Sequence, residues 1–327
     1  MKIKKVAVLG AGAVGSYIIW GLSKVKGIEL GVVADGNRAQ RLKKGCRINN
    51  SVYYPEVWTP QEAYGADLLI VALKYGALQG ALKDIKAVVG KNTVVMSLMN
   101  GIDSEEIIAS EIGDGNLLYS LIKIASHKED DGYHFDPETT IGIIFGEISA
   151  PFLSDRVQAV GELFENAGLR YRVTNYIREE IWSKFRLNVC SNLPQAVVGA
   201  GVGCYKDSLH MKAISDGLKH ELEAVASAKG IDMSKAEDTS KQVSLISPSA
   251  RYSTLQDLDA GRHTEIDMFS GALVRMGKEL GIPMPYNEYT YHIIKALEEK
   301  NDGKFEYTQK LFERRPMRCL FDVSMIE

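Results

Sequence analysis

The first hundred residues alternate between short apolar runs and longer stretches with the spacing of an amphipathic helix. Strands are expected at Lys2–Leu9, Leu30–Ala34, Leu68–Leu73 and Thr93–Met99, and helices at Val14–Lys24, Arg38–Lys44 and Leu78–Val89. Strands that alternate with helices in this way build a mostly parallel, doubly wound sheet. The pattern therefore predicts an α/β domain at the start of the chain.

The pattern changes twice further along the chain. Residues 117–147 show alternating character with turn signals at Asp130–Gly132 and Asp136-Pro137, which predicts antiparallel strands that extend the sheet. From Tyr176 onward helical periodicity dominates, with breaks near Gly199–Gly203, Gly230, Ser247-Pro248, Gly281–Pro285 and Asp302-Gly303. We expect an α/β domain over residues 1–175 and an all-α domain over 176–327. No Ser/Gly-rich linker separates them, so we expect a tight junction with a cleft.

A glycine-rich loop follows the first strand. Gly10, Gly12 and Gly15 have G-x-G-x-x-G spacing, and Ala13 and Val14 begin the helix. The first glycine permits a tight turn, the second lets the backbone approach a pyrophosphate, and the third lets helix and strand pack closely. The helix N-terminus offers N–H groups to the anion. The motif is weak alone, but its position between a strand and a helix predicts a Rossmann dinucleotide-binding domain.

Composition narrows the class of protein. The 327 residues include 39 Lys and Arg against 42 Asp and Glu, a net charge of −3, and 45% are hydrophobic. There is no basic field for nucleic acid and no apolar run long enough for a membrane helix, so we expect neither partner. We expect a cytoplasmic protein. The four cysteines are far apart and form no C-x-x-C pair, so we expect no metal.

Two polar side chains follow later strands of the predicted sheet. Lys74 comes directly after one strand, and Asn100 comes after the next and precedes Gly101. Ligands of open α/β sheets gather beyond the carboxyl ends of the strands. These side chains are therefore expected to face the same crevice as the glycine loop.

The helical half contains a polar stripe. Lys184, Asn188 and Asn192 recur every four residues, which places them on one helix face. A solvated face is the ordinary interpretation of such a stripe. Neighbouring Trp182 and Phe185 favour the other interpretation, in which the stripe lies against protein or a cleft.

A second polar segment spans 253–267. Ser253 with Gln256, and Thr264 with Asp267, have the spacing of capping boxes and predict two helix starts. Glu265 precedes the apolar stripe Phe269, Leu273, Met276 and Leu280. Its carboxylate has two interpretations, stabilisation by a helix dipole or a place on the apolar side.

Together these motifs resemble the ketopantoate reductase (2-dehydropantoate 2-reductase) family. They are the glycine loop, a Lys after one strand, an Asn-Gly after the next, W-x-K-x-x-x-N over 182–188, S-x-L-Q-D over 253–257 and R-H-T-E-I-D over 262–267. The resemblance covers Val6 to about Asn287. It implies a Rossmann domain followed by a helical domain, like that of the 6-phosphogluconate dehydrogenase group.

The resemblance also implies roles for residues. Lys184 matches the family's catalytic lysine and Glu265 its acidic partner, which orients the substrate. Hydride delivery to a ketone leaves charge on oxygen, and an ammonium can stabilise and protonate that alkoxide. Lys74 would lie near the cofactor ribose, and Asn100 where cofactor and substrate meet. Substrate contacts are implied for Asn100, Lys184, Asn188, Asn192, Ser253 and Glu265, with the carboxylate at Ser253.

The chain departs from the family at three places. Met99 stands where a Gln is usual, Ala250 where an Asn is common, and Gly199–Gly203 where a further asparagine is common. These departures are expected to lie in the substrate site. The reaction implied is reduction of 2-dehydropantoate to (R)-pantoate, a step toward coenzyme A. One alternative is an NAD-dependent D-2-hydroxyacid dehydrogenase acting on another branched or aromatic 2-oxo acid, and another is a non-catalytic nucleotide sensor.

The cofactor and the assembly have alternatives too. The family default is NADPH, but Asp35 ends the second strand, where a carboxylate binds ribose hydroxyls and repels a 2′-phosphate. Asp35 favours NADH, whereas Arg38, Lys43 or Lys44 offers a partner to a phosphate. Family members are monomers or dimers, so a homodimer is one expected assembly. The tail from Gly303 to Glu327 either packs on the helical domain or reaches a partner.

Overall fold

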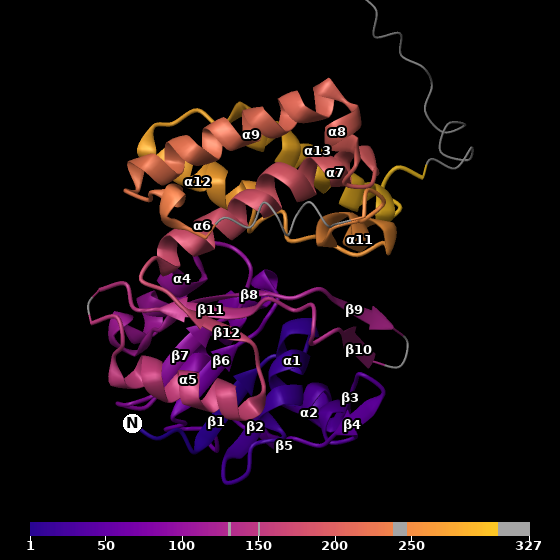
Figure 1. Cartoon of the computed structure of the whole chain (residues 1–327). Helices are drawn as coiled ribbons and strands as arrows, with labels where there is room; N and C mark the ends of the chain where they lie inside the picture. Colours follow the sequence, from indigo (N-terminus) through magenta and orange to yellow (C-terminus); the bar gives the residue numbers. More distant parts are fainter. Residues whose placement is uncertain (130–131, 150, 238–246, 307–327) are drawn as a thin grey trace, which may run out of the picture.

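A five-stranded parallel sheet forms the centre of the N-terminal half (Figure 1). In this computed structural model, which describes residues 1–129, 132–149, 151–237 and 247–306, the strand order is β5 (Glu56–Trp58), β2 (Glu29–Val33), β1 (Lys5–Leu9), β6 (Leu68–Val71) and β7 (Val94–Ser97). β1 pairs with β2 on one side and with β6 on the other. The expected parallel sheet is confirmed, with the glycine loop at the carboxyl end of its central strand.

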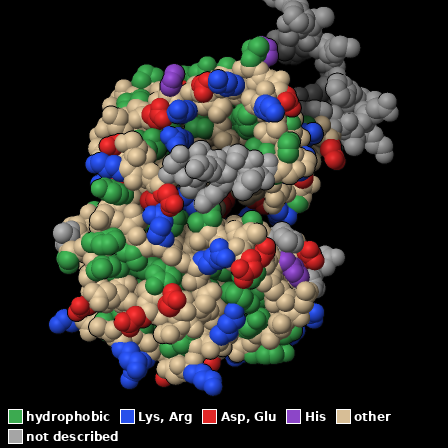
Figure 2. All heavy atoms as spheres, viewed as in Figure 1, with side chains coloured by type: hydrophobic (Ala, Val, Ile, Leu, Met, Phe, Trp, Pro, Cys, Tyr) green, Lys and Arg blue, Asp and Glu red, His purple; other side chains and the backbone are tan. Residues whose placement is uncertain are grey.

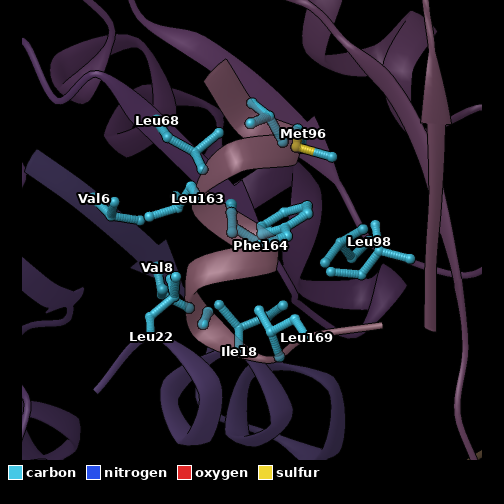
Figure 3. Close-up of a cluster of buried hydrophobic side chains, with 14 of the residues drawn as sticks. Val6, Val8, Ile18, Leu22, Leu68, Met96, Leu98, Leu163, Phe164 and Leu169 are labelled. Atoms are coloured by element: carbon cyan, nitrogen blue, oxygen red, sulfur yellow. The ribbon is translucent and has the colours of Figure 1, made fainter. Parts of the chain in front are cut away.

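Helices cover both faces of this sheet. Val6 and Val8 of β1 pack in one apolar cluster with side chains of α1 (Ala13–Leu22) and α5 (Asp155–Ala167) (Figure 3). The alternate residues Ala7 and Leu9 pack in a second cluster with side chains of α3 (Leu78–Val88) and α4 (Ser104–Ile112). A strand buried on both faces is typical of a doubly wound sheet, so the predicted class is confirmed. The short helix α2 (Gly36–Leu42) follows β2.

Residues 117–147 do form antiparallel strands, but most of them belong to other sheets. β8 (Tyr119–Lys123) pairs antiparallel with β11 (Gly142–Gly146), and β12 (Tyr171–Val173) completes that sheet. β9 (Ser126–Glu129) and β10 (Gly132–Phe135) instead join β3 (Cys46–Ile48) and β4 (Ser51–Tyr53). A parallel bridge between Val95 and Leu117 connects β7 to the start of β8. The expected extension of the sheet is thus wrong: β8 and β11 form a separate sheet joined to it by that bridge, and β10 pairs with β3 through Tyr133 and Ile48.

The C-terminal half is helical. Its helices are α6 (Ile177–Leu187), the π-helix η3 (Asn188–Asn192), α7 (Leu193–Val198), α8 (Cys204–Asp207), α9 (Leu209–Ala228), α11 (Ser253–Asp259), α12 (Ser270–Leu280) and α13 (Pro285–Asn301). This half also contains the 3₁₀ turn η4 (Met233–Lys235), whereas the 3₁₀ turns η1 (Tyr75–Ala77) and η2 (Asp114–Asn116) belong to the N-terminal half. Gly199, Gly230 and Gly281 have positive φ directly after α7, α9 and α12, so these expected breaks are confirmed. Residues 175 and 176 remain our proposed domain limit, and 307–327 of the tail lie outside the described residues.

Helix α6 joins the two halves. Leu121 of β8 and Ile144 of β11 are register partners, and both pack in the same apolar cluster as Ile181 and Phe185 of α6. Figure 1 shows α6 lying between the sheets below and the other helices above. This packing holds α6, which carries Lys184, against the N-terminal half.

Candidate active site

The glycine loop has the geometry that a pyrophosphate requires. Gly10 has φ +108°, and a Cβ there would lie 2.4 Å from the Ala72 carbonyl oxygen. A Cβ on Gly15 would lie 1.9 Å from the Gly10 carbonyl oxygen, whereas one on Gly12 would meet nothing within 4 Å. Gly12 caps α1 without a side-chain hydrogen bond, which leaves the first-turn N–H groups at Ala13 and Val14 for a ligand. The loop therefore fits a dinucleotide.

A small cavity continues from this loop toward the end of β2. Its volume is about 160 Å³, and it is lined by Leu9, Val33, Ala34, Asp35, Arg38, Pro60, Leu73, Ala77, Gly80, Ala81 and Asp84. The structure thus brings the predicted cofactor residues Asp35 and Arg38 together beside the strand that precedes the glycine loop. An apolar slot with charged groups at its rim suits an adenosine moiety.

Three predicted residues meet in one hydrogen-bonded chain across the domain junction. Lys184 Nζ on α6 donates to Asn100 Oδ1 at 2.8 Å. Asn100 Nδ2 donates in turn to Glu265 Oε2 at 3.1 Å. The backbone N–H of Tyr75 lies 3.4 Å from Glu265 Oε1 and donates to it. An amide from the sheet domain therefore links an ammonium and a carboxylate from the helical domain.

The environment of Lys184 favours proton transfer. Burial lowers the pKa of its ammonium from 10.5 to about 8, and the positive charge of Lys123 acts in the same direction. The negative charge of Glu265 opposes both effects. A lysine with a pKa near neutrality is suited to general acid catalysis.

The predicted asparagine stripe is buried, but it is not a regular α-helical stripe. Asn188 and Asn192 belong to the π-helix η3, which inserts a wider turn between α6 and α7. Asn192 Nδ2 donates to Asn188 Oδ1 at 3.2 Å, while Asn192 Oδ1 is buried and has no partner among the described residues. Such π-turns occur frequently at functional sites. The expected burial is confirmed and the regular four-residue spacing along one α-helix is wrong.

Other predicted residues lie apart from this chain of hydrogen bonds. Lys74 is exposed and its Nζ lies 3.4 Å from Asp257 Oδ2 on α11. Charged side chains of both signs occur along this boundary between the domains in Figure 2. Ser253 is exposed in the first turn of α11, and its side chain makes no hydrogen bond within the described part of the chain.

The helix start predicted at Ser253 is confirmed, because α11 begins there, but both capping boxes and the start at Thr264 are wrong. Tyr252 caps α11, and Ser253 is already helical. Helix α12 begins at Ser270, six residues after Thr264. Thr264 instead donates from its hydroxyl and its backbone N–H to the buried Glu298, each at 2.7 Å. A tertiary partner thus replaces the local one.

The departures from the family pattern have different surroundings. Met99 is 6% exposed and packs in the sheet core with Leu9, Val33 and Ile108, so its expected place in the substrate site is wrong. The Met99 side chain points into the apolar core beneath the Asn100-Gly101 turn.

The departures at Gly199–Gly203 and Ala250, by contrast, contact each other. The Ala250 carbonyl oxygen accepts from the Val202 N–H at 3.0 Å and from Gln195 Nε2 at 2.9 Å. A Cβ on Gly201 would lie 2.5 Å from the Pro248 carbonyl oxygen. Close backbone contacts and the Gln195 side-chain amide therefore fill this region.

Several residues at the junction escaped the sequence reasoning. Tyr75 Oη donates to Asp103 Oδ2 at 2.7 Å, and Arg275 donates to the same oxygen at 3.3 Å. Thr254 Oγ1 on α11, which packs against η3, is buried without a hydrogen-bond partner. Lys123 is also at the junction. Lys123 could have been found from the sequence, because it is a polar residue at an inward position of an apolar strand. Tyr75, Asp103, Arg275 and Thr254 could not, because their roles depend on tertiary contacts.

Comparisons with known proteins agree with this site. The model for ketopantoate reductase PanE/ApbA matches residues 6–146, and that for the ketopantoate reductase PanE/ApbA C terminal matches 176–298. A 2-dehydropantoate 2-reductase of Archaeoglobus fulgidus is 27% identical over 91% of this chain and 99% of that protein. The dinucleotide-binding glycine loop, the lysine of the helical domain and these matches together identify the class of protein as a nicotinamide-dependent oxidoreductase. The chain belongs to the ketopantoate reductase family.

Solved structures share the whole fold. A PanE/ApbA family ketopantoate reductase from Ralstonia eutropha JMP134 has a TM-score of 0.77 at 24% identity, covering 91% of this chain and 99% of that one. A D-mandelate dehydrogenase with NADH and anilino(oxo)acetate has a TM-score of 0.73 at 20% identity, with the same coverage of both chains. A Staphylococcus aureus ketopantoate reductase described as dimeric has 0.71 at 16%, again with the same coverage. Among the described residues, no helix is long and apolar enough to cross a membrane.

Proposed function

We propose that this protein reduces 2-dehydropantoate to (R)-pantoate with a reduced nicotinamide dinucleotide. The observation that carries the proposal is the chain from Lys184 through Asn100 to Glu265, which lies beside a loop that fits a dinucleotide. We propose Lys184 as the catalytic acid and Glu265 as its acidic partner. Asn188 and Asn192 are proposed substrate contacts, because both are buried in η3 and Asn192 Oδ1 has no partner.

The residues of this chain divide the work of the reaction. The nicotinamide, when bound, supplies a hydride to the ketone carbon. Lys184 donates its proton to the carbonyl oxygen, so that the alkoxide becomes a hydroxyl, and it regains a proton from solvent. Glu265 keeps the ammonium charged by its negative potential, and Asn100 fixes the direction of the Lys184 N–H groups.

A second candidate reaction is oxidation and reduction of another branched or aromatic 2-oxo acid by NAD(H). The observation that favours it is Ala250, whose side chain is a methyl group and whose backbone carbonyl alone takes part in hydrogen bonds, from the Val202 N–H and from Gln195 Nε2. A site with fewer polar side chains is suited to a more apolar substrate. The retained Lys184 and Glu265 argue against a third candidate, a sensor that binds nucleotide without turnover.

We further propose that NADH is accepted at least as well as NADPH. Asp35 lines the cavity at the end of β2, where its carboxylate accepts from ribose hydroxyls and repels a 2′-phosphate. Arg38 lines the same cavity, and its guanidinium would favour NADPH by pairing with the 2′-phosphate. A homodimer remains a prediction.

An absorbance assay at 340 nm tests the reaction. Ketopantoate is compared with a panel of bulkier 2-oxo acids, each with NADH and with NADPH. Turnover confined to ketopantoate supports the first candidate, and turnover confined to a bulkier acid supports the second. A protein that binds the cofactor but reduces none of these acids contradicts both.

The same assay on Asp35→Ser tests the cofactor proposal. We expect the ratio of kcat/KM for NADH over NADPH to fall in the variant, because the repulsion of a 2′-phosphate is removed. A preference of the unmodified protein for NADPH above about tenfold, or 1.4 kcal/mol, would contradict the proposal.

A further inference from the structure

A second lysine reaches the junction from the sheet side. β8 starts beside β7 and runs parallel to it, so its last residue, Lys123, lies at the same edge as the carboxyl ends of the central strands. Successive side chains of a strand alternate between faces. Tyr119 and Leu121 contact the helical-domain cluster, while Ser120 and Ile122 face the other way. Lys123 therefore points toward α6.

The Lys123 side chain is mostly buried, and within the described residues its ammonium has one ion-pair partner and no hydrogen bond. Its side chain is 15% exposed, and Nζ lies 3.8 Å from Glu180 Oε2, beyond hydrogen-bond range. The other oxygen of Glu180 already accepts from Arg172 at 2.6 Å and from the Glu237 N–H at 3.0 Å. Glu180 Oε2 is itself buried without a hydrogen bond. Within the described residues, the three N–H groups of Lys123 therefore make no hydrogen bond, in a region that excludes much water.

Lys123 is also a neighbour of the proposed catalytic acid. Glu180 and Lys184 are four residues apart on α6, which places them on adjacent turns of one face. The positive charge of Lys123 contributes to the lowered pKa of Lys184. Two ammonium groups therefore share this part of the junction, opposed by Glu180 and Glu265.

We propose that Lys123 binds the carboxylate of the 2-oxo acid while Lys184 contacts the ketone oxygen. In such an acid the carboxylate is bonded directly to the carbonyl carbon, so its nearer oxygen lies about 3 Å from the ketone oxygen, as bond lengths of this type require. Lys123, paired with a residue one helical turn from Lys184, offers that carboxylate a cationic partner. Ser253, the carboxylate ligand that the family resemblance implies, is exposed on α11 and makes no side-chain contact with Lys184, Asn100 or Glu265 within the described residues.

The inference rests on the proposed function, and its test separates the two. Steady-state kinetics are measured for Lys123→Met, Lys123→Gln and Ser253→Ala with a 2-oxo acid and with its neutral methyl ester. Lys86→Met, which removes an exposed ammonium on α3, is the control for loss of charge. We expect both Lys123 variants to raise KM for the acid by about 10- to 100-fold, the range for a hydrogen bond to a charged group. KM for the ester, and the Kd for NADH, should change little.

Binding of oxamate, an unreactive mimic of a 2-oxo acid, gives a readout that needs no turnover. We expect its Kd on the protein with bound NADH to rise in parallel with KM. If the unmodified protein reduces no 2-oxo acid, the proposed function fails, and oxamate alone decides the role of Lys123. The inference is overturned if oxamate binds the Lys123 variants as well as the unmodified protein, or does not bind the latter. Equal losses for acid and ester, or a selective loss in Ser253→Ala in place of the Lys123 variants, also overturn it.

Discussion

Glu265 should control the pH at which Lys184 loses its proton. The carboxylate raises the pKa of Lys184 against the effects of burial and of Lys123. Glu265→Gln removes this negative charge and keeps the shape of the side chain. The neutral amide keeps one acceptor, so one of the hydrogen bonds from Asn100 and the Tyr75 N–H is lost.

The size of the change follows from the geometry. Hydrogen bonds of 2.8 and 3.1 Å on either side of the Asn100 amide separate the two charges. A separation of roughly 7 Å at an effective dielectric constant of 20 gives about 2 kcal/mol, or about 1.5 pH units. The sign is fixed, because losing a negative neighbour makes the ammonium easier to deprotonate. The pKa of Lys184 should fall from about 8 to about 6.5.

The assay is the pH dependence of kcat/KM for reduction, at constant ionic strength and saturating cofactor. Reduction needs the protonated lysine, so activity should decline above pH 8 in the unmodified protein, and from a lower pH in Glu265→Gln. Glu279→Gln, which removes an exposed carboxylate on α12, should leave the profile in place. A Glu265→Gln profile that stays put or moves to higher pH refutes the coupling of these two residues.

Two further variants separate catalysis from stability. Lys184→Met should reduce kcat more than 100-fold, the scale of a lost general acid. The same variant should raise the unfolding free energy at pH 7 by about 2 kcal/mol. The lowering of the Lys184 pKa from 10.5 to about 8 costs the folded protein about 3 kcal/mol, and the loss of the hydrogen bond to Asn100 offsets part of the gain from removing that cost. The folded protein holds this proton less tightly than the unfolded chain, so the penalty is complete below pH 8 and fades toward pH 10.5; urea unfolding at pH 7 and 9.5 should show a gain that shrinks at the higher pH. Glu221→Gln should lower the melting temperature and leave KM unchanged. The buried Glu221 carboxylate accepts from the Tyr286 N–H and from two Asn287 nitrogens at the start of α13. The amide of Gln would lose one of these hydrogen bonds, which is worth about 1–3 kcal/mol. A large kinetic change in Glu221→Gln would contradict a purely structural role.

The parts that the sequence predicted correctly depend on neighbouring residues. The strand, glycine loop and helix at the N-terminus are specified within about twenty residues by the G-x-G-x-x-G spacing, and a Cβ on Gly15 would collide with the nearby Gly10 carbonyl oxygen. Lys184, Asn100 and Glu265 were predicted from sequence motifs. That these distant residues meet in one site was implied by the family resemblance. The comparisons confirm the family and the class of cofactor, whereas the roles of these residues stay predictions.

The errors arise where tertiary contacts override local patterns. Thr264 has the spacing of a helix cap, yet the distant Glu298 takes its hydrogen bonds. Met99 follows a strand that ends at the ligand edge, yet its side chain turns into the core. Tyr133 of β10 pairs with Ile48 of β3, eighty-five residues earlier, which alternation within 117–147 does not specify.

The π-helix at Asn188–Asn192 fixes how this chain tolerates insertion and deletion. A π-turn carries one residue more than an α-turn, and each residue of an α-helix rotates the next by about 100°. Deleting one residue of this segment would let the wider turn close into a regular α-turn, so the buried Leu193 and Ala196 of α7 would keep their places in the core while Asn188 or Asn192 moved relative to Lys184. A deletion of one residue within Asn188–Asn192 should therefore leave the fold intact and cost activity, because it changes where the two asparagines stand relative to Lys184.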